Sequence, residues 1–287
     1  MPARGFDHLV WAVTDLDATA ARLEALGFTV TPRARHPWGT ENRLVQLDGF
    51  FLELLGVGEG ADIPESEGDV FSFGAFNRDF LSAREGGSML VLESRDPEAD
   101  RLAFERAGLA VYAPFSFERE QRLSDGGSRK VGFDLTFTRD PNDAVNGFFT
   151  CFNRYPENFW SADYQIHANG VRTLKAIVVV CEEPAMHHIF YSAFTGEREM
   201  RATSLGITIA TPRGDLRLMT PQAYERLFGE SVELVDRQPR IAAALFSGGN
   251  RSQIEARCRD AGLETRVAPE GLVVPASLGA GLALVFL

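Results

Sequence analysis

The chain has 287 residues, enough for one large domain or two of ordinary size. Its composition is that of a folded soluble protein, with 45% hydrophobic and 24% charged residues. A net charge of −11 disfavours nucleic acid and anionic membranes as partners, because like charges repel at long range. Residues 271–287, the longest uncharged stretch, are too few for a membrane span, and the first residues carry no apolar signal core. We therefore expect a cytoplasmic protein with a small-molecule ligand; a homodimer stays open.

Several common site motifs are absent from the sequence. Cys151, Cys181 and Cys258 are widely spaced without a CxxC pair, which indicates reduced, buried thiols and not a disulfide framework or a zinc knuckle. The stretch SGGN at residues 247–250 lacks the lysine of a P-loop and the spacing of a dinucleotide fingerprint, so we expect no nucleotide cofactor. The sequence has neither a G-x-S-x-G elbow nor an H-E-x-x-H helix, which excludes hydrolases of those types.

The predicted elements repeat four times along the chain. Residues 6–13 form an apolar strand, Asp15 caps a helix that ends at Gly27, and strand-like runs follow at residues 28–34, 42–47 and 50–57. The same order follows the strands predicted at residues 88–93, 173–181 and 240–246, whose helices end at Gly108, Gly196 and Gly262. Glycine suits this point because the residue after a helix commonly adopts a left-handed conformation.

This pattern predicts an α+β protein of four βαβββ units. The glycines are too unevenly spaced for a solenoid with a fixed repeat, and they favour two pairs of units. We expect the first pair over residues 1–153 and the second over 171–287. Residues 154–170 form a polar and aromatic joint between them.

Four such units resemble the vicinal oxygen chelate superfamily, which includes glyoxalases, extradiol dioxygenases and antibiotic-resistance binding proteins. The detailed resemblance is to its glyoxalase-like members. It rests on FDHLV at residues 6–10, VTDL at 13–16, LGF at 26–28, HPWGTEN at 36–42, FLELL at 51–55 and HANGV at 167–171. The resemblance covers essentially the whole chain. It implies two half-barrels, in which a concave face holds a divalent metal through residues of the first and last strands of each unit.

In the first unit, the resemblance places His8 and Glu53 at the metal-ligand positions. Strand alternation supports both, since His8 shares a face with Phe6 and Val10 and Glu53 shares one with Phe51. A buried carboxylate needs a cation, a donor or a proton. Imidazole with carboxylate suits Zn, Mn, Fe, Co or Ni. The alternative is that the two side chains pair with each other or with ordered water in a satisfied core.

The other three units offer fewer ligands. The same offset from the helix-ending glycine puts Met89 in the position of His8, and the aligned phenylalanines put Cys151 in that of Glu53. In the third and fourth units the positions fall on residues without a ligand atom: Ile177 or Ala176, Leu218, Ala243 and Val285. We therefore expect the N-terminal cup to be the functional one and the C-terminal pair to be ligand-poor.

The stretch from His36 to Arg43 is predicted to be a rigid polar loop. His36, Thr40, Asn42 and Arg43 are candidates for binding an oxygenated or anionic ligand, because polar loops on stiff scaffolds often carry specificity. The alternative is an ordinary turn with a surface arginine.

The joint contains two further binding candidates, Trp160 and His167. One interpretation is a lid that offers His167 as a base or third ligand; the alternative, which we favour, is a joint buried by its aromatic residues. His187 and His188 are adjacent and point in different directions along a helix, which favours a structural role for both.

Two functions remain in competition. The first is a glyoxalase-like, metal-dependent lyase, isomerase or oxygenase that acts on a small oxygenated metabolite, with His8 and Glu53 as ligands and catalytic groups. The second is a metal-free protein that binds or sequesters a small molecule. Met89 and Cys151 favour the binder, whereas His8 together with Glu53 favours the enzyme, which is the function we expect.

Overall fold

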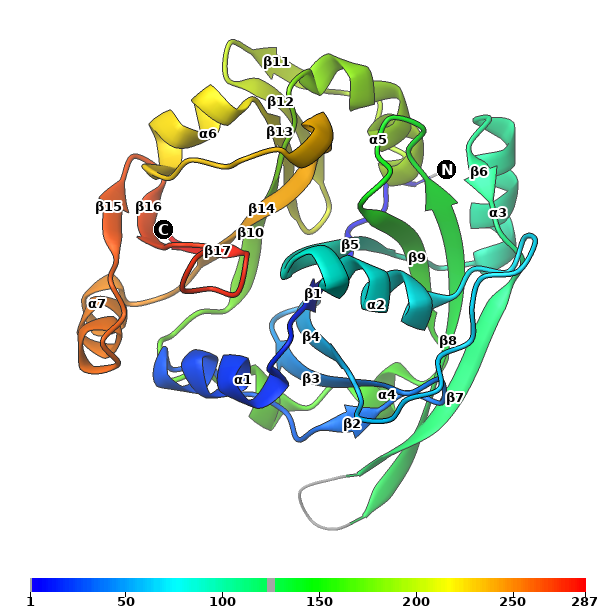
Figure 1. The fold of residues 1–287 in the computed structure, drawn as a ribbon, viewed down its shortest axis with the longest axis horizontal. Coiled ribbons are helices and arrows are strands. Elements are labelled where there is room, and N and C mark those ends of the chain that lie inside the picture. Colours follow the sequence, from blue (N-terminus) through cyan, green and yellow to red (C-terminus); the bar gives the residue numbers. More distant parts are fainter. Residues whose placement is uncertain (1, 123–126) are drawn as a thin grey trace.

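The computed structural model describes residues 2–122 and 127–287, and it contains the four predicted βαβββ modules (Figure 1). The first module comprises β1, α1, β2, β3 and β4 (Phe6–Ala12, Leu16–Ala25, Ala34–Arg35, Thr40–Gln46 and Phe51–Val57). The second comprises β5, α3, β6, β7, β8 and β9 (Gly86–Glu93, Pro97–Arg106, Ala110–Val111, Phe115–Arg122, Ser128–Arg139 and Gly147–Asn153).

The C-terminal modules repeat this order with shorter strands. The third comprises β10, α5, β11, β12 and β13 (Thr173–Val180, His188–Thr195, Arg201–Thr203, Gly206–Thr211 and Gly214–Met219). The fourth comprises β14, α7, β15, β16 and β17 (Arg240–Ser247, Arg251–Asp260, Arg266–Ala268, Gly271–Val274 and Ala283–Phe286). Further helices join the modules: α2 (Phe73–Ala83), α4 (Pro156–Phe159), α6 (Pro221–Phe228) and short 3₁₀ turns over Ala162–Gln165, Pro184–His187 and Val235–Arg237.

The helix ends follow the sequence signals. Four glycines end the module helices in the left-handed region, with φ of 88° at Gly27, 71° at Gly108, 76° at Gly196 and 67° at Gly262. At the other end of α1, the side chain of Asp15 accepts a hydrogen bond from the backbone of the third helical residue, as predicted. No helix in the described residues has the length and apolar character that crossing a membrane requires.

Two details differ from the sequence-based expectation. The strand predicted at residues 28–34 is reduced to β2, because the backbone after Gly27 first hydrogen-bonds to the end of α1 and to Leu44. The linkers between paired modules form α2 and α6, which were not predicted. Both lie against the concave faces of the sheets and supply buried aromatic residues, Phe73 from α2 and Tyr224 from α6.

Strand pairing arranges the modules as two half-barrels. In the first, β1 runs parallel to β4 and antiparallel to β5, and β5 runs parallel to β9. The second repeats this arrangement, with β10 between β13 and β14 and with β14 parallel to β17. The two curved sheets meet where Ile241 of β14 pairs with Gly87 of β5. In Figure 1 the blue-to-green and green-to-red halves therefore lie side by side.

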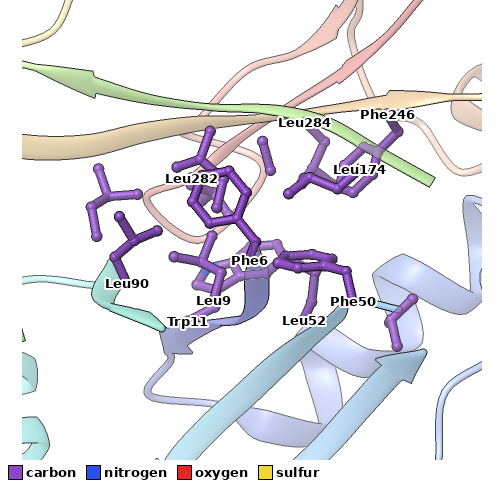
Figure 2. Close-up of a cluster of buried hydrophobic side chains, with 14 of the residues drawn as sticks. Phe6, Leu9, Trp11, Phe50, Leu52, Leu90, Leu174, Phe246, Leu282 and Leu284 are labelled. Carbon is purple, nitrogen blue, oxygen red and sulfur yellow. The ribbon is translucent and has the colours of Figure 1, made fainter. Parts of the chain in front are cut away.

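The halves share one buried core. Residues from α1, α3, α5 and α7 join it, together with one face of each sheet. Figure 2 shows Phe6 and Trp11 of β1 gathered with Leu282 and Leu284 of the last module. The indole Nε1–H of Trp11 donates to the carbonyl oxygen of Ala280 at 2.9 Å. The opposite, concave faces carry separate clusters, one in each half.

Replacing Leu284 with alanine is expected to destabilise both halves together, because this side chain is 1% exposed within the shared core. Truncation of a buried leucine lowers the free energy of unfolding by about 2–5 kcal/mol. All tryptophans precede β10, so their fluorescence reports on the first half while far-UV circular dichroism reports on both. In urea unfolding, the midpoints of both signals should fall together.

The matched control is Val267→Ala, since Val267 is 70% exposed and its truncation should change stability by less than about 0.5 kcal/mol. A fluorescence midpoint that Leu284→Ala leaves in place would show that the halves unfold independently.

Candidate functional site

A pocket opens on the concave face of the first half-barrel, which we call the first cup. Its cavity volume is about 40 Å³, which is room for a few water molecules or an ion. Its polar lining comes from His8, His36, Asn42, Glu53, Arg119 and Cys151. Its apolar lining comes from Trp38, Leu44, Phe51, Phe73, Phe117, Phe133, Leu135, Phe149 and Phe159. Five of the predicted site residues therefore line one pocket.

A β-bulge in β1 orients the first group. Phe6 pairs with Leu92 and His8 with Val91, so Asp7 is the extra residue on β1. The bulge turns Phe6 into the shared core while His8 lines the cup, and the prediction that these two residues share a face is wrong. Strict alternation also concealed Asp7, whose carboxylate lies beside the imidazole of His8.

His8 is held on both sides of its ring. Its Nδ1 lies 2.6 Å from Oδ2 of Asp7, and its ring stacks on Phe51 with centroids 4.4 Å apart. Because Asp7 accepts the Nδ1 hydrogen, we assign the tautomer that leaves a lone pair on Nε2. This nitrogen lies 3.7 Å from Oε2 of Glu53.

His36 approaches Glu53 from the loop between β2 and β3. Its Nδ1 lies 2.9 Å from Oγ1 of Thr40, which also accepts the indole N–H of Trp38 at 2.8 Å. The ring stacks on that indole at 4.8 Å. Its Nε2 lies 3.6 Å from Oε1 of Glu53 and 3.4 Å from the amide nitrogen of Asn42. This network is satisfied when His36 carries its hydrogen on Nδ1, so its Nε2 lone pair also faces Glu53.

Glu53 lies at the centre of these contacts. It is 5% exposed and accepts a hydrogen bond of 2.6 Å from Nδ2 of Asn42. Burial raises the pKa of the Glu53 carboxyl, against the opposing influence of His8 and Asn42. Burial also holds the pKa of His36 well below its ordinary value, aided by the charge of Arg119. A neutral imidazole at His36 offers an electron pair and no charge.

A second group of potential ligands lies on the other side of His8. The ligand atoms of Asp7, His8 and Cys151 lie within 4.8 Å of one another. Here, however, a hydrogen lies between Asp7 and His8, and burial together with nearby carboxylates raises the pKa of the Cys151 thiol well above its ordinary value. In the group of His8, His36 and Glu53, Nε2 of each imidazole lies within 4.0 Å of a carboxylate oxygen, although the three ligand atoms do not all lie within 4.8 Å of one another.

The second module has no histidine at the position of His8. Val91 pairs with Phe149 as His8 pairs with Phe51, so Val91 and not the predicted Met89 occupies that position. The offset from the helix-ending glycine misled the alignment because the intervening segment is shorter in the second module. Met89 and Val91 are both fully buried in the cup's apolar cluster.

The third module also differs from the expected alignment. β10 carries the same register shift as β1, which places Ala176 at the position of His8 and Arg217 at that of Glu53, in place of Leu218. Arg217 pairs with Glu270 at 2.8 Å. A guanidinium cannot donate an electron pair to a metal.

The fourth module is apolar at both positions. Leu245 pairs with Val285 as Val91 pairs with Phe149, so Leu245 occupies the position expected for Ala243. Val285 then matches a phenylalanine of the first cup and not Glu53. The concave face of this half is filled by an apolar cluster that includes Tyr224 and Phe228 of α6.

Four of the predicted binding residues, His167 among them, lie outside the pocket lining. Arg43 is on the opposite face of β3 from Asn42, where its Nε donates to the carbonyl of Thr31. Thr40 is buried behind His36 and orients it. Trp160 packs behind the pocket against Phe51.

His167 belongs to the joint and not to the cup. Its Nδ1 accepts the backbone N–H of Thr29 at 2.9 Å, and its Nε2 lies 2.8 Å from the carbonyl of Gln46. Both ring nitrogens are thus engaged. His187 is likewise buried against Asp140 at 2.7 Å, whereas His188 is exposed, so the two adjacent histidines do diverge.

The sequence-based search missed four pocket-forming residues. Asp7 was hidden by the bulge, and Phe73 lies on the unpredicted helix α2. Trp38 was quoted within a motif without a role. Arg119 was detectable, because it continues the alternation of Phe115 and Phe117 along β7 and therefore faces the cup.

Solved structures with this fold carry various names. A hypothetical protein from Staphylococcus aureus superposes with a TM-score of 0.69 at 12% identity, covering 99% of this chain and 100% of that one. A mutant of 4-hydroxymandelate synthase from Streptomyces coelicolor gives 0.56 at 11% identity, with coverage of 100% and 92%. A xylose isomerase-like TIM barrel/4-hydroxyphenylpyruvate dioxygenase fusion protein gives 0.54 at 16% identity, with coverage of 93% and 40%. At these identities the likeness concerns the fold alone.

The sequence itself identifies the family. No curated protein matches the chain. Residues 6–195 match the family described as the glyoxalase-like domain, and this range contains every lining residue of the first cup. Since the match spans more than half of the chain, and the four βαβββ modules agree with it, the chain belongs to the glyoxalase-like domain family.

Proposed function

We propose that the first cup holds a divalent transition metal through His8, His36 and Glu53. The observation that carries this proposal is the convergence of two imidazole lone pairs on one buried carboxylate, at 3.7 and 3.6 Å. Electron-pair donors that face each other without a hydrogen between them repel, and a cation between them removes that repulsion. Asn42 donates to one oxygen of Glu53 and leaves the other facing His8.

The donor set suits such an ion. Two imidazoles and one carboxylate with open positions are the ligands that non-haem iron, zinc, manganese, cobalt and nickel accept. The histidines also have the outer partners that metal-binding imidazoles have: the carboxylate of Asp7 for His8, and the hydroxyl of Thr40 for His36.

The reaction we propose is that of a lyase, isomerase or oxygenase on a small oxygenated metabolite. When bound, the metal would polarise adjacent oxygens of the substrate. The aromatic side chains that line the pocket would exclude water from the substrate. Glu53, which is buried in the same pocket, would accept a proton from it. The rival function, metal-free binding or sequestration of a small molecule, would use the same pocket.

Metal analysis of the purified protein separates these functions. We expect a bound transition metal, or a rise in melting temperature on addition of Ni, Zn, Mn, Fe or Co. A ligand at a hundred times its Kd stabilises the native state by about 2.7 kcal/mol. His8→Ala and Glu53→Ala should each abolish that rise while leaving the far-UV circular dichroism spectrum unchanged.

The control is His188→Ala, because His188 is exposed and remote from the pocket lining, and it should bind metal like the parent protein. Protein that is purified without metal and gains no stability from any of the five ions would defeat the enzyme proposal and favour the metal-free binder.

Asp7→Asn is expected to weaken metal binding without removing a ligand. An amide orients His8 less strongly than a carboxylate, and loss of such outer partners typically lowers metal affinity about 10- to 100-fold. Competition titrations with a chromogenic chelator measure the change. If Asp7 were instead a ligand beside Cys151, then Cys151→Ser would weaken binding comparably, whereas our proposal expects little change.

A further inference from the structure

Arg119 brings a positive charge into the first cup. It lies on β7 opposite Val131, on the face that carries Phe117, and it is part of the pocket lining. It is the sole arginine or lysine among the lining residues. Its charge acts on Glu53 and His36 across the pocket.

Within the described residues, the guanidinium of Arg119 has no partner. Its Nε and Nη1 are buried without a hydrogen-bond acceptor, and it forms none of the ion pairs that the described carboxylates make with other arginines. By contrast, Arg154 pairs with Asp134 and Arg213 with Glu93. Burial lowers the pKa of Arg119, but arginine remains protonated at physiological pH. Arg119 is partly exposed as a whole, but burying two of its guanidinium nitrogens without an acceptor is unfavourable, so their place in a pocket needs an explanation.

Glu53 is not that missing partner. Its oxygens are committed to Asn42 and lie near the two histidines, and no contact within 4.0 Å joins it to Arg119. Among the described residues no side chain supplies an acceptor for Nε and Nη1 of Arg119. A bound anion would satisfy the guanidinium through charge-assisted hydrogen bonds.

We propose that Arg119 binds the carboxylate of a small ligand whose apolar or aromatic body lies against Phe117, Phe133 and Phe159. A single guanidinium matches the single charge of a carboxylate, whereas a phosphoryl dianion calls for more positive charge than this lining supplies. With a net charge of −11, the protein does not attract anions at long range, so a local cation has to provide the recognition. This inference rests on the proposed function for the choice of pocket, but not for the metal.

The test uses full-length protein stripped of metal with EDTA, and isothermal titration with phenylacetate as the probe. Phenylacetamide is the neutral match of the same shape, and phenylphosphonate represents phosphoryl ligands. We expect the parent protein to bind phenylacetate about tenfold or more tightly than phenylacetamide, as charge-assisted hydrogen bonds imply. Arg119→Met should lose this preference, and Arg119→Lys should restore part of it.

The melting temperature provides a second readout. If Arg119 only stabilised the fold, its replacement would lower the melting temperature. Removing an unpaired buried charge should leave the melting temperature of Arg119→Met equal to or above that of the parent protein. The matched control is Arg154→Met, an arginine at the end of the same sheet whose guanidinium pairs with Asp134 outside the pocket. It should keep the full preference for phenylacetate.

The proposal is overturned if phenylacetate shows no binding at millimolar concentration, binds no better than phenylacetamide, or binds more weakly than phenylphosphonate. A preference that survives in Arg119→Met also overturns it. Failure of the metal proposal gives a different result. In that case added metal would stabilise neither the parent protein nor His8→Ala, while the preference of the parent protein for phenylacetate over phenylacetamide would persist.

Discussion

The chemistry of the first cup depends on one electrostatic constraint: a buried carboxylate faces two imidazoles whose other nitrogens already donate their hydrogens. Within the described residues, Asn42 is the side chain that donates a hydrogen bond to Glu53. Each neighbour is arranged to keep this state, with Asp7 behind His8 and Thr40 behind His36. The proposed cation site depends on this arrangement, because it sets two imidazole nitrogens beside one buried carboxylate.

The bulge in β1 gives one strand two unrelated tasks. On one side Phe6 and Trp11 contribute to the core shared by both halves. On the other, Asp7 and His8 enter the site. Packing in the shared core holds β1 in place, and β1 in turn positions the imidazole of His8. The position of this side chain therefore depends on contacts that the C-terminal half makes with β1. That half keeps the same ladder, but its concave face is filled by apolar side chains, which accounts for its lack of comparable ligands.

The repeat was predictable because the units carry strong local signals: a capping side chain in the first, second and fourth, and an apolar helix face and a glycine with positive φ in all four. His8 and Glu53 were predictable because a polar group on a buried strand face stands out. Counterparts in the other modules were not, because bulges and segments of different length shift the register in ways that a fixed offset misses. Val91 in place of Met89, and Arg217 in place of Leu218, show this directly.

The depth of the site has a kinetic consequence. His8, His36 and Glu53 are 4%, 6% and 5% exposed, so a ligand or ion that reaches them has to pass the aromatic side chains that line the pocket. Some of those side chains belong to the short linker helices α2 and α4, which contribute Phe73 and Phe159. Entry and escape then follow the opening rate of these linkers, and a bound molecule acquires a long residence time without high intrinsic affinity.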